Sequence, residues 1–163
     1  MSWCGSERPT RGGSGPRLVI GYGNPQRRDD GLGPFVATAL EARLGHRDRT
    51  RVLVPQQLGP DLIDELKEAD LVIMVDAALA LEEGRRWTRL EADPDRVPYL
   101  SHTCTPEYLL GLLGLVHQRF PEAWLVSIRG DDFGHGEGLS PGAGARTGRV
   151  IAEISDFLLS KED

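Results

Sequence analysis

The feature of this sequence that most restricts its fold is an alternation of short apolar runs with longer segments of helical period. The apolar runs are rich in β-branched residues and lie at 18–21, 52–54, 71–75 and 124–128, with a fifth, more polar run at 87–92. This order is typical of parallel strands joined by crossover helices, with the polar run at an edge. We expect a three-layer α/β/α fold around a mostly parallel, twisted sheet of about five strands.

Prolines indicate where the helices of this fold begin. Proline is favoured at the first helical position, because the N–H group that it lacks would have no partner there. Four prolines precede apolar positions of helical spacing: Pro34, Pro60, Pro106 and Pro141. Thr105 and Ser140 stand directly before two of them and are expected to act as N-caps.

Length and composition restrict the number of domains, the kinds of partner and the cellular location that we expect. The chain has 163 residues, which suits a single α/β domain over 17–160, preceded by a disordered lead at 1–16 that has no apolar signal segment. A formal charge of −6 disfavours nucleic acid and anionic membranes as partners, and no apolar run is long enough to span a bilayer. Two cysteines form no disulfide framework and suit the cytoplasm. We expect a monomer there.

The segment after the first expected strand has an unusual composition. Gly21-Tyr22-Gly23-Asn24 resembles the start of a dinucleotide fingerprint, but Gln26 stands where the third glycine belongs. Asp29 and Asp30 follow, and two carboxylates would repel a pyrophosphate. A nucleotide site is therefore a weak alternative at this stage. Another alternative is that Asp29 or Asp30 only caps the next helix.

Two further polar residues are expected at the same edge of the sheet, because ligands of such folds bind beyond the carboxyl ends of the strands. Asp76 follows the apolar run 71–75, and His102 precedes the helix expected at Pro106. Either residue alone could be an ordinary loop residue. Together with Asp30, they provide two carboxylates and one imidazole, a set that suits a divalent first-row metal and leaves coordination positions open.

Other catalytic arrangements fit less well. The sequence has no Gly-x-Ser-x-Gly motif, no paired-histidine zinc helix and no cysteine cluster, and Cys104 does not obviously face His102. The glycine-rich stretch 134–138, which contains His135 and Glu137, is expected to be a mobile connection at the same edge and to help hold a substrate.

Across residues 17–158, the chain resembles the endopeptidases that mature nickel-iron hydrogenases by trimming the carboxyl-terminal extension of the large subunit. The resemblance is carried by four ordered motifs: Gly21 to Asn24 with Asp29 to Gly33, Val75 to Ala77, Ser101-His102 with Thr105 to Glu107, and Gly138 to Pro141. It implies that Asp30, Asp76 and His102 form the metal site and carry the reaction. Well-known members have glutamate where this chain has Asp30, which leaves Asp29 as a second candidate for that ligand.

The resemblance also implies a partner and a metal. The partner is the immature large subunit, and the metal is nickel already inserted into it, so the free enzyme is expected to be largely metal-free. The main alternative is a nickel-binding hydrogenase assembly chaperone that does not cut the extension. A flavodoxin-like nucleotide-binding module is a weaker alternative. The sequence leaves the particular hydrogenase, the cleavage position and the attacking nucleophile open.

Overall fold

The computed structural model describes residues 15–45, 49–93 and 103–159. In these ranges, the strands are β1 (Arg17–Gly21), β2 (Thr50–Leu53), β3 (Leu71–Ala78), β4 (Arg85–Leu90) and β5 (Glu122–Arg129). The helices are η1 (Arg28–Gly31), α1 (Leu32–Leu44), η2 (Pro60–Leu62), α2 (Ile63–Leu66), α3 (Pro106–His117) and α4 (Pro141–Leu159). The lead expected at 1–16 falls almost entirely outside the described residues.

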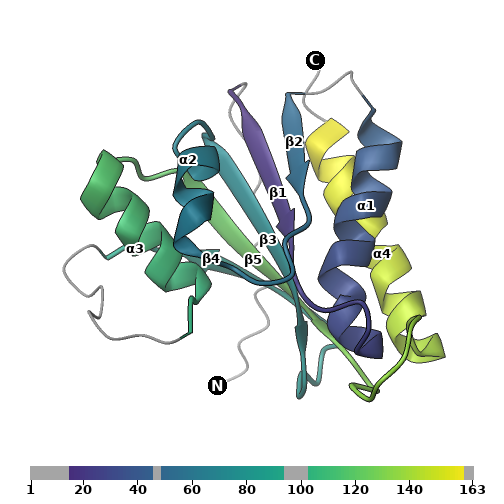
Figure 1. Ribbon diagram of the computed structural model, residues 1–163. Helices are drawn as coiled ribbons and strands as arrows, with labels where there is room; N and C mark the ends of the chain where they lie inside the picture. Colours follow the sequence, from purple (N-terminus) through teal and green to yellow (C-terminus); the bar gives the residue numbers. More distant parts are fainter. Residues whose placement is uncertain (1–14, 46–48, 94–102, 160–163) are drawn as a thin grey trace, which may run out of the picture.

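The described strands form one sheet in the order β2-β1-β3-β5-β4. β1, β2, β3 and β5 are parallel, whereas β4 pairs with β5 in the antiparallel direction at the edge. Helices α1 and α4 cover one face of the sheet, and α2 and α3 cover the other (Figure 1). The predicted three-layer α/β fold with a mostly parallel sheet is confirmed. No helix in the described residues is long and apolar enough to cross a membrane.

The central strand β3 supplies side chains to both cores. Ile73 and Val75 pack under α1 and α4, whereas Val72 and Met74 pack under α2 and α3. This alternation follows from the two-residue period of a strand. The alternation explains why the run is apolar throughout. Both faces of the strand are buried, and each Å² of apolar area removed from water stabilises the folded state by roughly 25 cal/mol.

The predicted helix starts are confirmed at Pro60, Pro106 and Pro141. The Thr105 hydroxyl accepts a hydrogen bond from the Tyr108 N–H at 3.1 Å, which is the expected N-cap. Two details differ. α1 begins at Leu32, two residues before Pro34, because η1 leads directly into it. The prediction that Asp76 follows β3 is also wrong, because the strand continues through it to Ala78.

Two glycines allow α1 to approach the strand ends closely. A Cβ atom at Gly33, in the first turn of α1, would collide with the backbone carbonyls of Tyr22 and Val75. Gly23 adopts φ +140°, which side chains rarely tolerate, and a Cβ there would collide with the Asp30 carbonyl. Gly33, together with Gly23 of the fingerprint-like stretch, therefore serves close packing of η1 and α1 against the strand ends in this chain.

Candidate functional site

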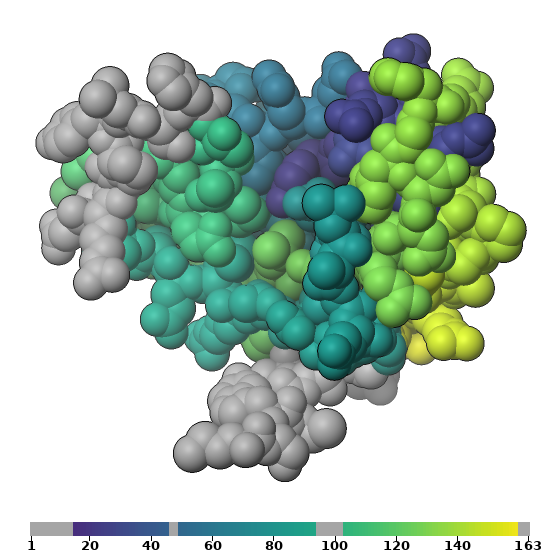
Figure 2. Space-filling model, turned by 90° about the horizontal axis from the view of Figure 1, so that it is seen from below, coloured from purple at the N-terminus to yellow at the C-terminus, as the bar shows by residue number. Residues whose placement is uncertain are grey.

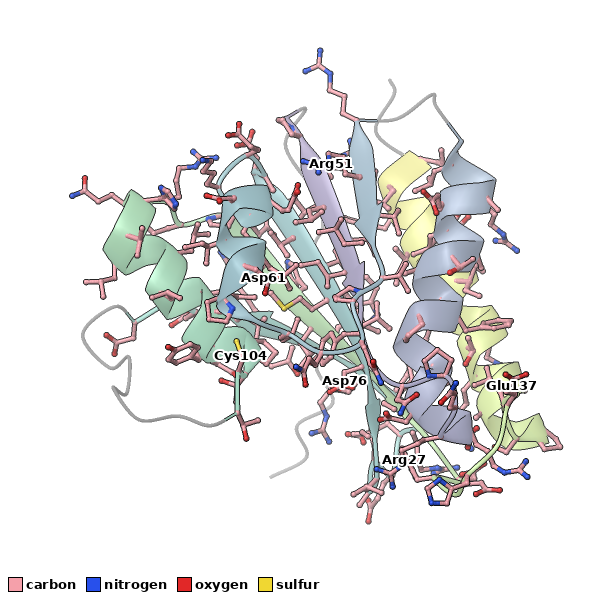
Figure 3. All side chains as sticks on the ribbon, viewed as in Figure 1. Arg27, Arg51, Asp61, Asp76, Cys104 and Glu137 are labelled. Carbon is pink, nitrogen blue, oxygen red and sulfur yellow. The ribbon has the colours of Figure 1, made fainter. Side chains whose placement is uncertain are left out.

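Three segments meet at the carboxyl edge of the sheet. Tyr22 follows β1, Asp30 lies in η1, and Asp76 lies near the end of β3. The Tyr22 N–H donates to the Val75 carbonyl at 3.3 Å, which holds the end of β1 beside Asp76. Asp76 continues the alternation of Val72 and Met74 and so faces the α2 and α3 side. Figure 3 shows it at the lower edge, between the two helical layers.

The surroundings of Asp76 disfavour its charge. One carboxylate oxygen accepts the Ala77 N–H at 2.8 Å, and the Tyr22 hydroxyl donates to the same carboxylate. Burial outweighs these hydrogen bonds and, together with the negative charge of Asp30, raises the pKa of Asp76 to about 6. Burial and the neighbouring Asp76 carboxylate also raise the pKa of Tyr22, which keeps its hydroxyl protonated as a donor.

The Asp30 carboxylate is close enough to Asp76 to repel its charge. The hydrogen-bonding capacity of the Asp30 carboxylate is only partly used by the protein. Its Oδ2 atom accepts the Asn24 N–H at 2.9 Å, and this is the single hydrogen bond that the described residues give to its carboxylate. Two neighbouring, half-buried carboxylates are an arrangement that a cation would stabilise. The donor set therefore fits a metal ion with hard or borderline preference.

The third predicted ligand, His102, lies outside the described residues. Within them, no group of three His, Cys, Asp or Glu side chains could hold a metal. Cys104, two positions after His102, and Glu107 in the first turn of α3 both lie close enough to Tyr22 to raise the pKa of its hydroxyl. The described start of α3 therefore borders the Tyr22 and Asp76 pair. Figure 3 shows Cys104 at the start of α3 and Asp76 near the end of β3.

Cys104 itself is unsuited to nucleophilic attack. It is a free cysteine, half-buried, and burial followed by the negative charge of Asp61 raises the pKa of its thiol. A raised pKa keeps the thiol protonated at neutral pH, and the thiolate is the reactive form. This agrees with the expectation from sequence that a cysteine nucleophile is a poor explanation for the site.

Asp29 has a different environment from Asp30, although the two are adjacent. It is 0% exposed, and its Oδ2 accepts hydrogen bonds from the Asp131 N–H at 2.7 Å, the Asp132 N–H at 2.9 Å and the Ser140 hydroxyl at 2.7 Å. Its Oδ1 accepts the Ser140 N–H at 2.8 Å. Because both oxygens are engaged, Asp29 is not placed to share the role of Asp30. Neither aspartate caps α1, whose N-cap is Gly31.

The amides of the first loop are also engaged, which bears on the nucleotide alternative. The Gly23 N–H donates to the Gln56 carbonyl at 3.1 Å, and the Asn24 N–H donates to Asp30. The Gln26 N–H donates to the Asn24 side chain at 3.0 Å. A phosphate-binding loop needs such amides free to point at the ligand. The loop is therefore built for internal bonding and does not favour a nucleotide.

A cavity of about 360 Å³ adjoins this loop. Its walls are Gly23 to Gln26, Pro34, the residues Val54 and Gln56 after β2, and Glu137 from the segment after β5. Asn24 connects the cavity to the site, because it lines the cavity and donates to Asp30. Figure 2 looks onto this edge and shows the yellow-green segment after β5 beside the dark blue first loop.

Three solved structures with the same fold cover most of this chain. One is the nickel-iron hydrogenase maturation protease HycI from Thermococcus kodakarensis KOD1, with a TM-score of 0.68, 21% identity, and coverage of 88% of this chain and 92% of that chain. Another is the hydrogenase maturating endopeptidase HybD from E. coli, with a TM-score of 0.61, 22% identity, and coverage of 85% and 89%. An endopeptidase from Escherichia coli gives a TM-score of 0.64, 24% identity, and coverage of 90% and 94%.

The chain has the fold of the nickel-iron hydrogenase maturation proteases. No protein-family model matches the sequence, and no curated protein matches it. The likeness thus lies in the arrangement of the elements, with at most 24% identity in these three structures. Within the maturation-protease fold, the site described above occupies the carboxyl edge, where open α/β sheets bind their ligands.

Two residues at this edge were not predicted as functional from the sequence. Tyr22 donates to Asp76, and the only available signal was its place directly after a strand that neighbours β3. Ser140 was expected to cap α4, but its hydroxyl donates to Asp29. No local signal indicates that bond, because 111 positions separate the two residues.

Proposed function

We propose that this chain is an endopeptidase that removes the carboxyl-terminal extension of a nickel-iron hydrogenase large subunit after nickel insertion. The observation that carries the proposal is the pair Asp30 and Asp76, two half-buried carboxylates that repel each other at the edge of a maturation-protease fold. In this proposal, Asp30, Asp76 and His102 recognise the nickel within the precursor. The nickel belongs to the substrate, so purified protein should contain little metal.

The reaction class follows from the same residues. The nickel would act as a Lewis acid towards the scissile carbonyl or the attacking water, and a site carboxylate would accept the water's proton. Water adds to the carbonyl carbon, the C–N bond breaks, and the departing amine takes up a proton. Asp76, with a pKa of about 6, is mostly ionised at neutral pH and is a stronger base than an ordinary aspartate. No described cysteine is activated for a competing covalent route.

The surface around the site favours a protein substrate. Phe35 in the first turn of α1 is 53% exposed, Val54 after β2 is 45% exposed, and Leu79 after β3 is 78% exposed. These three large apolar side chains stand around the edge that holds Asp30 and Asp76. Exposed apolar groups around a polar centre are typical of protein interaction sites. A location in the cytoplasm, where such a precursor would be met, belongs to the same proposal.

A cleavage assay separates this function from the chaperone alternative. Purified protein is incubated with nickel-loaded precursor and with nickel-free precursor, and the mass of the large subunit is followed by mass spectrometry. The enzyme proposal predicts a mass decrease equal to the extension for the nickel-loaded precursor alone. A chaperone would bind the precursor and leave its mass unchanged. Equal cleavage of both precursors would contradict nickel recognition.

A further inference from the structure

The segment after β5 is attached to the first loop along its length. The Arg28 N–H donates to the Gly136 carbonyl at 3.0 Å, and the Gly136 N–H donates to the Gln26 carbonyl at 2.9 Å. The Asp29 N–H donates to the Asp132 carbonyl at 2.9 Å. The first two bonds form a parallel bridge between Arg27 and Gly136, and all three bonds join loops that are about one hundred residues apart. They argue against the mobility that the glycines of 134–138 led us to expect.

The buried carboxylate of Asp29 is the centre of this attachment. It receives the Asp131 and Asp132 N–H groups at the start of the segment and both the N–H and the hydroxyl of Ser140 at its end. Four donors thus converge on one side chain that can only accept when ionised. Hydrogen bonds to a charged group contribute more to stability than bonds between neutral groups do. Because the carboxylate bonds both ends of the segment 131–140, it holds these ends together and closes the segment.

The closed segment adjoins both the candidate site and the cavity. Asp29 is followed in η1 by Asp30, whose carboxylate is held by the Asn24 N–H. Glu137, within the closed segment, lines the cavity together with Asn24 and Gln26. Moving the segment would therefore move a cavity wall.

We propose that Asp29 is a positioning residue, which locks the segment 131–140 against the Asp30 loop and so fixes the cavity wall that contains Glu137. We take the occupant of the cavity to be the polypeptide of the precursor, and this part of the proposal rests on the proposed function. The lock itself is a property of the free protein. The two parts can therefore be tested separately.

The lock is tested by amide hydrogen exchange in the Asp29→Asn variant. An asparagine replaces one accepting oxygen by an NH₂ group, which would face the donors now bound to the carboxylate. We expect the amides of Asp131, Asp132 and Ser140 to exchange about tenfold faster or more, beyond the change in the β3 amides, which reports the loss of global stability. Asp156→Asn, an exposed substitution of the same type on α4, should leave all of these rates unchanged. Unchanged exchange at the three amides in Asp29→Asn would overturn the lock.

A milder variant covers the case in which Asp29→Asn does not fold. Ser140→Ala removes only the hydroxyl that donates to Asp29 Oδ2 at 2.7 Å and keeps the backbone N–H. Exchange of the Asp131 and Asp132 amides, which share that oxygen, should then rise about threefold. Rates equal to those of the original protein would again contradict the lock.

The substrate part is tested by the kinetics of precursor cleavage under conditions in which the variants are folded. Because the cavity wall contributes to binding, Asp29→Asn should raise KM about tenfold and change kcat less than about twofold. Asp156→Asn should change neither. Faster exchange with an unchanged KM would remove the substrate part and leave the lock. If the original protein cleaves no precursor, the proposed function fails, and the exchange data still decide on the lock.

Discussion

Asp29 and Asp76 lie at the same edge of the sheet, yet the protein treats their carboxylates in opposite ways. Asp29 receives four hydrogen bonds and is fully buried. Burial alone would raise its pKa, but the bonds from Ser140, Asp131 and Asp132 outweigh burial and lower it. Asp76 has two hydrogen-bond donors and a negative neighbour, and burial raises its pKa to about 6.

This difference separates a structural carboxylate from one that is available to a ligand. The charge of Asp29 is compensated within the protein, so it stabilises the fold and has little to offer a metal. The charge of Asp76 is compensated poorly, and a cation that reaches it would replace the repulsion from Asp30 by attraction. Sites with this property are often functional, because they retain an instability that the ligand relieves.

The largest expected effect on stability comes from Asp29→Asn. The substitution leaves donors of Ser140, Asp131 and Asp132 in a buried place without a matching acceptor. We therefore expect the free energy of unfolding to fall by about 2 to 4 kcal/mol at pH 7. Urea unfolding followed by circular dichroism measures this difference. The exposed Asp156→Asn variant should change it by less than about 0.5 kcal/mol. A loss of that small size in Asp29→Asn would remove the distinction between the two carboxylates.

A smaller effect of opposite sign is expected from Asp76→Asn. Because the pKa of Asp76 is raised to about 6, the folded protein holds a proton between pH 4 and 6 that the unfolded chain releases. The contribution of Asp76 to stability therefore falls as pH rises through this window. Asparagine removes the repelled charge and should stabilise the protein by about 1 kcal/mol at pH 7.

The pH dependence provides the check on that result. Near pH 4, where the folded protein carries Asp76 in its neutral form, the gain from Asp76→Asn should largely disappear, and urea unfolding at pH 4 and pH 7 measures the change. Asp29 should behave in the reverse way, because its lowered pKa gives stability that is present above about pH 4 and lost in acid. An Asp76→Asn gain that is equal at both pH values would show that the charge is not the cause.

An effect of similar size, but destabilising, is expected from Tyr22→Phe, which removes the hydroxyl that donates to Asp76. We expect a loss of about 1 kcal/mol at pH 7 and a further rise in the pKa of Asp76, since one of the bonds that lower it is gone. A double-mutant cycle with Asp76→Asn, measured by urea unfolding, should show coupling between the two positions. Additive effects would mean that the bond does not favour the charged form of Asp76.

The parts of this architecture that depend on local signals could be predicted from the sequence. Pro106 and Pro141 indicate their helix starts directly, and the apolar run before Asp76 places that residue near a strand end. The lock around Asp29 could not be predicted, because its partners lie 102 to 111 positions away. Nothing in the neighbouring sequence distinguishes Asp29 from Asp30, and only the packed loops give them different roles.

Cleavage of nickel-loaded precursor by Asp76→Asn tests the central claim most directly. The substitution keeps the side-chain shape, removes the charge that a dication requires, and should leave the protein at least as stable as before at pH 7. The large subunit should therefore keep its full mass with the variant, even at high protein concentration, while the original protein shortens it. Shortening of the precursor at the original rate by folded Asp76→Asn would show that this carboxylate does not recognise the nickel and that the edge described here is not the working site.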